Sequence, residues 1–393
     1  MLSSSDNSAL AVIREYLEEI AYGYVNYRLV PDQDNHPFPP FDELQAKLKV
    51  QFPIYRLIFS LFRQGHVCDE AILREALPKP VFDALEATGL IEVNRQKEWR
   101  TPGVLLLSIE GLYIVVSIPS SYPTCQNLRQ PIYFGPDSIQ LIHALPAQLE
   151  GARVLDVCSG SGIQGLICAA RGASYVLCLE RAPEAVAAAR FNAALNGLAD
   201  TVEVRESDLL ESVAREEVFD FFVSTPPCTA APRQLDSFIG TFGGSDGTSI
   251  VAQMFRALRP HMSSKAKGIM YCTGIGSQCS IYLNRFVLNA IAGQDGFFIR
   301  GFVQNKVRIE RYKEALKNYL REISPRLSAS ERTSIVEDWL RNLSNGNEVT
   351  HFYDEVLRFW VGRGEAGLVD LPAYNPLLTD PLVEKLDLIK VAV

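Results

Sequence analysis

Apolar and polar positions alternate in two different ways along the chain. In the first part, apolar residues recur every three or four positions over residues 8–30 and 54–64, which predicts two amphipathic helices. After residue 151, short apolar runs alternate with helical patterns. Such alternation predicts an α/β fold with a doubly wound, mostly parallel sheet. We therefore expect two domains, one over residues 1–120 and one over residues 121–393.

Residues 69–118 have a pattern of their own within the first domain. Asp69 and Pro80 each begin a short predicted helix, and Leu90–Val93 and Val104–Ile109 then alternate like the strands of a hairpin. Two helices followed by a two-stranded wing are typical of a winged-helix module, whose usual partner is DNA. The stretch holds eight acidic and five basic side chains. We therefore expect no DNA binding and favour a structural or dimerising module.

Glycines and carboxylates follow the predicted strands of the second domain. The strand that contains Asp156 runs into Gly160 and Gly162, where glycine permits a positive φ and a close approach of the backbone to a ligand. The helix that begins there offers unpaired N–H groups to a negatively charged group. The next strand ends in Glu180, 24 residues after Asp156, where a carboxylate can bind ribose hydroxyls. This spacing predicts a nucleotide-containing cofactor.

The combination resembles the class I S-adenosylmethionine-dependent methyltransferases. Asp156–Gly162 is similar to the nucleotide-loop motif of this family, Glu180 to its ribose-binding acid and Ser207-Asp208 to the motif beside the adenine. Gly243–Gly247 is similar to a Gly-Gly-x-Asp-Gly segment of the HemK-like branch, which has the methyltransferase small domain. The resemblance covers residues 131–275. It implies a Rossmann-like, seven-stranded methyltransferase sheet and S-adenosyl-L-methionine as the cofactor.

The resemblance also implies roles for individual residues around these motifs. Methyl transfer would take place at the Pro-Pro motif, Thr225, Pro226, Pro227 and Cys228. Candidate substrate contacts are Tyr133, Phe134 and Asp137. Cofactor contacts are expected from Asp156, Cys158, Ser159, Gly160, Gly162, Gln164, Glu180, Arg181, Ser207, Asp208, Leu209 and Thr225.

The Pro-Pro motif departs from the Asn-Pro-Pro-Tyr that is usual in the HemK-like branch. There, the asparagine oxygen and a proline carbonyl accept hydrogen bonds from the target amino group. Thr225 has a shorter reach, and Cys228 cannot stack on a planar amide or base. We therefore expect a small polar metabolite as the acceptor, methylated on nitrogen or oxygen. Two alternatives remain open: a HemK-like protein glutamine or RNA base N-methyltransferase, and a non-catalytic cofactor-binding scaffold.

The composition limits which classes of partner and which cellular compartment we expect. With 38 basic and 46 acidic residues the chain has a net charge of −8, which argues against a general nucleic-acid binder and against an anionic membrane surface. No apolar run reaches the ~18 residues of a transmembrane helix, and the first residues do not resemble a signal peptide. The eight cysteines form no Cys-x-x-Cys pair, and the five histidines are scattered. We therefore expect a cytoplasmic chain without a metal site.

The pattern of apolar residues in the C-terminal part predicts a pair of strands with helices between them. Phe297–Arg308 and Val356–Val361 have the pattern of the last antiparallel pair of such a sheet. Between them, residues 311–344 contain two helical stretches. We expect this insertion and the N-terminal domain to form a lid over the acceptor. An oligomerisation element, and with it a homodimer, is the open alternative.

Overall fold

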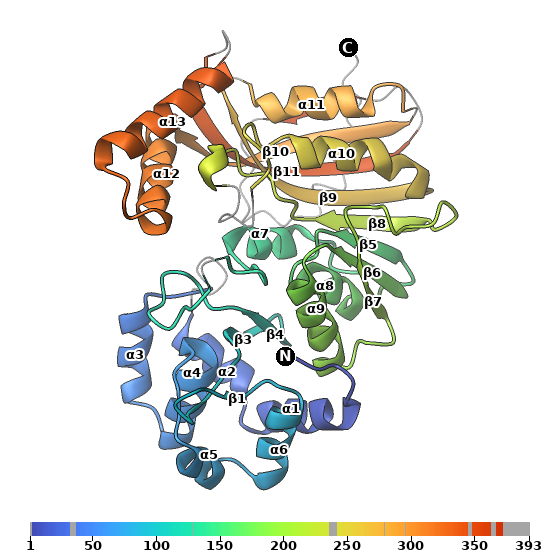
Figure 1. The fold of residues 1–393 in the computed structure, drawn as a ribbon. Coiled ribbons are helices and arrows are strands. Elements are labelled where there is room, and N and C mark those ends of the chain that lie inside the picture. The colour runs from blue at the N-terminus through green and yellow to red at the C-terminus, as the bar shows by residue number, and fades with distance from the viewer. Residues whose placement is uncertain are drawn as a thin grey trace.

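The computed structural model describes residues 2–31, 37–127, 129–235, 242–278, 280–294, 296–344, 348–362 and 367–371. Figure 1 shows a helical N-terminal lobe below a larger lobe that is built on one sheet, with α7 (Pro136–Ala144) between the two. Among the described residues, no helix is long and apolar enough to cross a membrane. Cys279 lies outside the described residues.

The N-terminal lobe contains more helices than the periodicity predicts. A single helix over residues 8–30 is wrong, because Ala21 has a left-handed backbone (φ 49°) that separates α1 from α2. A further helix, α3, follows at Phe41–Lys49 without a predicted counterpart. The helices of this lobe are α1 (Asn7–Glu19), α2 (Tyr22–Leu29), α3 (Phe41–Lys49), α4 (Pro53–Gln64), α5 (Glu70–Ala76) and α6 (Lys79–Ala87).

The strands of this lobe form two hairpins instead of the predicted one. β1 (Glu92–Val93) pairs with β2 (Trp99–Arg100), and β3 (Val104–Ile109) pairs with β4 (Leu112–Ser117). The predicted pairing of Leu90–Val93 with Val104–Ile109 is therefore wrong. Glu110 and Gly111 both have positive φ, as a two-residue hairpin turn requires, so β3 folds back on its nearest neighbour. The winged-helix assignment of α5, α6 and β1–β2 stays a prediction.

The main sheet has the order β12-β10-β11-β9-β8-β5-β6-β7. Strands β5 to β9 are parallel, and β11 is antiparallel to both β9 and β10. These seven strands form the predicted Rossmann-like sheet, and short β12 adds a further edge. The strands are β5 (Arg153–Val157), β6 (Tyr175–Glu180), β7 (Val202–Glu206), β8 (Phe219–Ser224), β9 (Met262–Gly276), β10 (Phe297–Arg308), β11 (His351–Val361) and β12 (Gly367–Leu371).

Alternate residues of the buried strands supply two separate cores. Along β5, Val154 joins the core beneath α7 and α8, whereas Leu155 joins the core beneath α10 and α11. The first of these cores also contains residues of β3 and β4, so the N-terminal hairpin covers part of one face. The helices of the sheet lobe are α8 (Ile163–Ala170), α9 (Pro183–Leu195), α10 (Ser249–Leu258) and α11 (Tyr282–Ile291).

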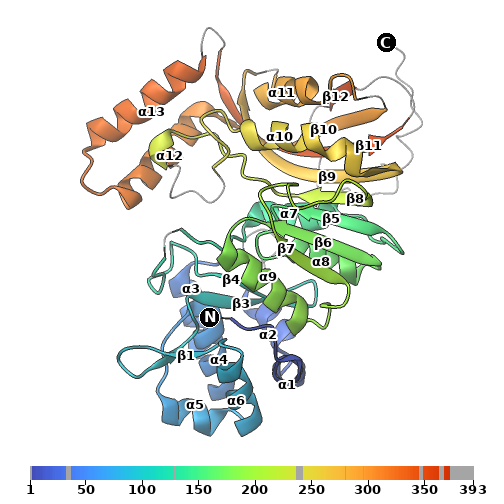
Figure 2. The same cartoon turned by 45° about the vertical axis from the view of Figure 1, so that its right-hand side comes forward.

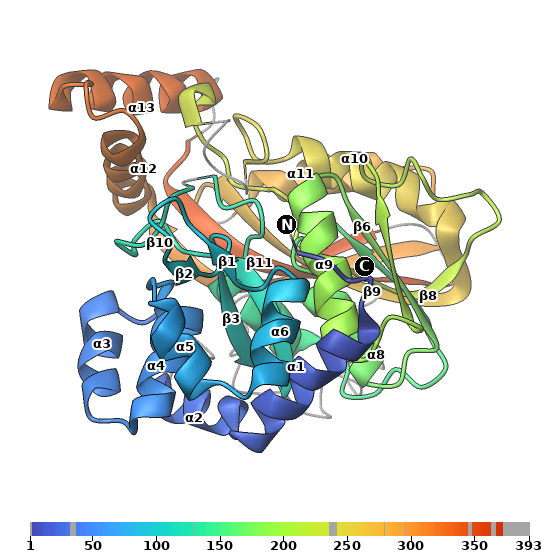
Figure 3. The same ribbon diagram turned by 60° about the horizontal axis from the view of Figure 1, so that its bottom comes forward.

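The C-terminal insertion consists of α12 (Ile309–Ile323) and α13 (Ala329–Ser344), close to the two helical stretches that the sequence predicts. Figures 2 and 3 show both helices projecting beyond the end of the sheet instead of lying on one of its faces. Their apolar side chains form a small core with Ala230, Ala231 and Leu235, just after the Pro-Pro motif. The insertion therefore adjoins the segment in which we expect methyl transfer.

Two asparagines, one in the last turn of α9 and one directly after it, attach the N-terminal hairpin to the sheet lobe. Asn192 is fully buried; its Oδ1 accepts the N–H of Val115 at 2.8 Å, and its Nδ2 donates to the carbonyl of Ser161 at 2.9 Å. One turn later, Asn196 accepts the N–H of Tyr113 at 2.8 Å and donates to its carbonyl at 2.6 Å. In the described part of the chain, these bonds satisfy an edge of β4 that no other strand covers.

We expect Asn192→Ala to destabilise the fold by about 3 kcal/mol, because it leaves a buried backbone N–H and a buried carbonyl without their partner. Urea denaturation followed by circular dichroism measures the loss. The exposed Gln96→Ala is the control and should unfold with the wild type. Equal midpoints for Asn192→Ala and the wild type would contradict this role.

Candidate functional site

The loop between β5 and α8 has the backbone of a ligand-binding turn. Cys158, Gly160 and Gly162 have φ of 59°, 54° and 79°, so three residues within five take left-handed conformations. A Cβ on Gly162 would also lie 3.1 Å from the Cβ of Ala189 on α9. The loop therefore needs a glycine at position 162 both for its φ and for the close approach of α9.

Asp156 is buried at the end of β5, and its carboxyl group is hydrogen-bonded to the start of α8 that follows the loop. Its Oδ2 accepts the N–H of Gly165 at 2.9 Å, whereas its Oδ1 is buried without a partner among the described residues. Burial raises the pKa of Asp156 to about 8, and the N–H of Gly165 offsets part of that effect. The carboxyl group thus supports the loop from within.

This raised pKa predicts a pH-dependent stability. A carboxyl group with a pKa of 3.8 in the unfolded chain and of about 8 in the folded one binds more protons when folded, so stability falls as the pH rises between these values. Asp156→Asn does not titrate. We therefore expect its free energy of unfolding, relative to that of the wild type, to increase from about pH 5 to about pH 8. Urea denaturation without cofactor tests this, and a difference that is independent of pH would refute it.

Glu180, at the end of β6, is directed at the same loop. One carboxylate oxygen accepts the N–H of Gly160 at 2.9 Å, and the other accepts the N–H groups of Arg181 and Ala182, both at 2.8 Å. The carboxylate thus lies within hydrogen-bond reach of the glycine turn, as a group that binds ribose hydroxyls requires. The structure thus brings Asp156 and Glu180, which are 24 residues apart in the sequence, to one loop.

The third candidate segment follows β7 beside Glu180. The N–H of Ser207 donates to the Glu180 carbonyl at 2.9 Å, and its Oγ accepts the N–H of Ser212 at 3.1 Å. Asp208 and Arg181 approach each other to 4.0 Å, and both side chains are largely exposed. Leu209 has a φ of 49°. Ser207, Asp208 and Leu209 therefore follow the strand next to that of Glu180, where the adenine motif is expected.

These residues fit a nucleotide cofactor with an amino-acid part. Ser159, Ser161 and Asp156 are buried. Among the described residues, the two serine hydroxyl oxygens and Oδ1 of Asp156 have no hydrogen-bond partner. Buried polar atoms of this kind call for a bound partner. Together with the Glu180 carboxylate and the start of α8, they offer acceptors and donors around one glycine turn. We therefore expect Asp156, Ser159 and Glu180 to contribute to cofactor binding.

The Pro-Pro motif follows β8 next to this loop. Ser224 donates its hydroxyl to the Val157 carbonyl at 2.6 Å, and Gln164 of α8 donates to the Thr225 hydroxyl at 3.4 Å. Pro226 is buried, whereas Thr225 and Pro227 are partly exposed. The structure thus brings the predicted methyl-transfer residues to the predicted cofactor loop.

Cys228 ends the motif inside the protein. Its Sγ accepts the N–H of Thr273 on β9 at 3.1 Å, and its carbonyl accepts the Thr273 hydroxyl at 3.1 Å. A hydrogen bond from the Cys272 thiol and the one from the Thr273 N–H lower the pKa of Cys228. Gly243 also contacts the motif, because a Cβ at this position would lie 2.5 Å from the Cα of Cys228.

The three predicted substrate residues differ in their surroundings: two are hydrogen-bonded to each other, and the third lies in the hydrophobic core. Tyr133 donates its hydroxyl to Oδ1 of Asp137 at 2.8 Å, and burial together with Asp137 raises the pKa of Tyr133. Phe134 is buried in the core, with its ring edge-on to that of Phe38 at 6.3 Å. Tyr133 and Asp137 therefore bind each other, whereas Phe134 packs in the core.

Several residues at this site are not apparent from the sequence. Tyr271, Thr273 and Asp354 come from β9 and β11, whose strand patterns give no sign that these positions adjoin the motif. Tyr312 comes from the insertion and donates its hydroxyl to the Ala230 carbonyl at 2.6 Å. Among the residues described next to the motif, Gly243 was indicated by the sequence, because it belongs to the Gly-Gly-x-Asp-Gly segment.

A Rossmann-like sheet with a glycine turn, a buried aspartate and an acid at the end of the next strand is typical of proteins that bind a nucleotide cofactor. Comparison with known proteins agrees. Residues 136–241 match the family model described as "Methyltransferase small domain". The "Putative protein N5-glutamine methyltransferase" of Methanocaldococcus jannaschii is 33% identical over 151 residues, which are 37% of this chain and 68% of that protein. The chain therefore belongs to the methyltransferase small domain family of S-adenosylmethionine-dependent methyltransferases.

Two other relatives match over shorter parts of their length. The release factor glutamine methyltransferase of Clostridium acetobutylicum is 34% identical over 126 residues, 28% of this chain and 44% of that protein. The ribosomal protein L11 methyltransferase of Heliobacterium modesticaldum is 39% identical over 82 residues, 21% of this chain and 26% of that protein. The chain thus spans less than half the length of these two relatives.

Proposed function

We propose that this chain transfers the methyl group of S-adenosylmethionine to a nitrogen atom of a protein acceptor. The observation that carries this proposal is the contact between the two motifs, in which Gln164 at the start of α8 donates to Thr225 of the Pro-Pro motif at 3.4 Å. A methyl group delivered at the glycine turn would thus meet an acceptor held at the motif. Relatives named as protein glutamine and ribosomal protein methyltransferases support a protein acceptor.

Each part of the site has a role in this proposal. Glu180 and the glycine turn hold the cofactor, which supplies a methyl carbon activated by its bond to a positively charged sulfur. Thr225 and the carbonyl groups of the motif accept hydrogen bonds from the acceptor nitrogen and direct its lone pair at that carbon. Methyl transfer is an in-line displacement, so alignment of the two reactants supplies much of the acceleration.

Transfer of a labelled methyl group tests the acceptor class. The purified chain is incubated with methyl-labelled S-adenosylmethionine and a cell lysate, which is then separated into protein and small-molecule fractions. We expect the label in the protein fraction. Label found in small molecules alone would refute a protein acceptor, and a calorimetric titration that shows no cofactor binding would refute the enzyme itself.

A small polar metabolite is the second candidate, and one observation favours it. Thr225 and Cys228 replace the asparagine and tyrosine of the usual motif, and Cys228 is buried against Thr273 and cannot stack on a planar group. The relatives favour the protein acceptor over this metabolite, which is the acceptor that the sequence alone favours. The labelling experiment separates the two candidates directly.

A further inference from the structure

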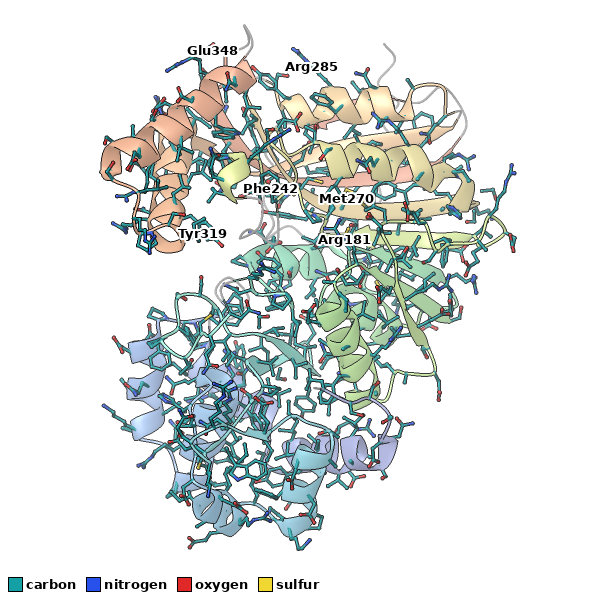
Figure 4. The ribbon with its side chains drawn as sticks, viewed as in Figure 1. Arg181, Phe242, Met270, Arg285, Tyr319 and Glu348 are labelled. Carbon is teal, nitrogen blue, oxygen red and sulfur yellow. The ribbon has the colours of Figure 1, made fainter. Side chains whose placement is uncertain are left out.

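A groove of about 430 Å³ lies between the insertion and the segment that follows the Pro-Pro motif. One wall is α13, and the other is Pro232 with the short 3-10 helix Arg233–Leu235. The volume is within the range of ~300–1,000 Å³ that is usual for ligand pockets. Figure 4 shows the labelled Phe242 between the insertion and the sheet lobe, where it packs against the core of the insertion.

The lining of this groove has the composition of a binding surface. The less exposed side chains are mostly apolar: Pro232 and Trp339 are buried, and Ile335 and Leu343 are partly buried. The exposed side chains around them are polar, namely Arg233, Gln234, Ser334, Asp338 and Asn342. An apolar centre with a polar rim is the usual arrangement where a protein binds a segment of another protein.

Backbone hydrogen bonds fix one wall of the groove to the Pro-Pro motif. Thr229 directly follows the motif, and its carbonyl accepts the N–H of Gly243 at 3.0 Å. The N–H of Ala231 donates to the Gly244 carbonyl at 3.4 Å, and Pro232, the next residue, begins the groove. The groove is therefore continuous with the segment in which we expect methyl transfer.

The insertion is fixed to the same segment. Trp339 donates its indole N–H to the carbonyl of Ser245 at 2.9 Å, and Tyr312 of α12 donates its hydroxyl to the carbonyl of Ala230 at 2.6 Å. Apolar side chains of α12 and α13 share a core with Ala231 and Leu235. Both walls are thus formed before a partner binds, which lowers the cost of ordering the groove on binding.

Arg233 carries a charge that no other side chain of the groove compensates. On the opposite wall, Asp338 accepts the Ser334 hydroxyl at 3.1 Å and forms an ion pair with Arg341 at 3.2 Å. Arg233 is exposed and forms no ion pair within the part of the chain that the structure describes. The planar guanidinium group of arginine suits a carboxylate, which it can bind through two hydrogen bonds.

We propose that this groove binds a segment of the protein acceptor close to the methylated residue, with an apolar side chain on Trp339 and a carboxylate on Arg233. This inference rests on the proposed function, because it concerns how the protein acceptor is recognised. A segment in the groove would place the neighbouring part of the acceptor at the Pro-Pro motif. Since α13 lies outside the residues 136–241 that match the family model, the groove is a feature that this model does not describe.

Two substitutions at exposed positions test the groove. Ser334→Trp fills it from α13, and Arg233→Glu reverses its charge. We expect each to raise the apparent KM for protein about tenfold or more while kcat stays within about twofold, because both residues lie away from the reacting atoms. Initial rates with labelled S-adenosylmethionine are measured at increasing concentrations of the protein fraction of a cell lysate.

Matched controls separate a lost binding site from a damaged fold. Thr333→Trp on α13 and Arg256→Glu on α10 are the same changes at exposed positions outside the groove, and both should keep the wild-type KM. Cofactor affinity by calorimetry and the urea midpoint of the two groove variants should match those of the wild type. A KM within twofold of the wild type in both groove variants would overturn the inference and leave the proposed function standing. A wild-type chain that labels no protein would refute the proposed function itself.

An exchange of charges tests the chemistry of the partner. Mass spectrometry of the labelled protein locates the methylated residue, and we expect an aspartate or glutamate close to it. Lysine at that acidic position should raise the KM with the wild-type chain, and Arg233→Glu should restore it. An acceptor without a nearby acid would overturn the inference. So would sedimentation that shows a dimer of this chain dissociated by Arg233→Glu, because the groove would then hold a second copy.

Discussion

Replacing Glu180 by alanine should weaken the binding of S-adenosylmethionine by about 10- to 100-fold. The carboxylate is held at the glycine turn by the N–H groups of Gly160, Arg181 and Ala182. A hydrogen bond to a charged group contributes about 1.5–3 kcal/mol. Loss of the hydrogen bond between the Glu180 carboxylate and a cofactor hydroxyl therefore accounts for this factor. Isothermal titration calorimetry with the purified chain measures the dissociation constant directly.

The matched control for this prediction lies one turn further along the chain. Glu184 is an exposed residue of α9, and Glu184→Ala removes the same charge without touching the glycine turn. Its dissociation constant should equal that of the wild type. Equal losses in the two variants would show that net charge near the loop, and not the position of Glu180, determines affinity.

Gly243→Ala should reduce methyl transfer about 100-fold without loss of cofactor affinity. A Cβ at this position would lie 2.5 Å from Cα and 2.8 Å from the carbonyl carbon of Cys228, both backbone atoms that cannot rotate away. The Pro-Pro motif must therefore shift, and a displacement of about 1 Å of an aligning group is enough to cost two orders of magnitude. Initial rates with labelled cofactor, together with calorimetry, separate the two effects.

Ser245→Ala is a suitable comparison for the glycine variant. Ser245 lies in the same loop, and the contact that it makes to the insertion is through its carbonyl, which accepts the indole N–H of Trp339 at 2.9 Å. We expect its rate to match the wild type. If Gly243→Ala retained full activity, the packing of this loop on the motif would have no part in aligning the acceptor.

The sheet lobe could be predicted well because its signals are local. Short apolar runs that end in Asp156, Glu180 and Ser224 identify strands, and parallel strands bring their carboxyl ends to one edge. From that rule, the glycine turn after β5 and the Pro-Pro motif after β8 are expected at the same edge. The expected role of each strand end, in cofactor binding or in methyl transfer, came from the resemblance to a known family.

The remaining features depend on pairing and packing over long distances in the chain. Ala21 itself does not indicate that the helical pattern stops there, since alanine favours a helix, yet it takes a left-handed conformation in the folded chain. Asp354 lies opposite Thr273 only through the register of β11 on β9. The contact of Tyr312 with Ala230 spans 82 residues. No periodicity of the sequence encodes such neighbours.

One side chain joins the two lobes of the molecule at the cofactor loop. Asn192 binds the backbone of β4 in the N-terminal lobe and, through the same amide group, the carbonyl of Ser161 in the cofactor loop. Any ligand that steadies this loop therefore also steadies the hairpin. The backbone amide of Val115 would exchange its hydrogen more slowly in the liganded protein, so this hairpin would report cofactor occupancy from outside the binding site.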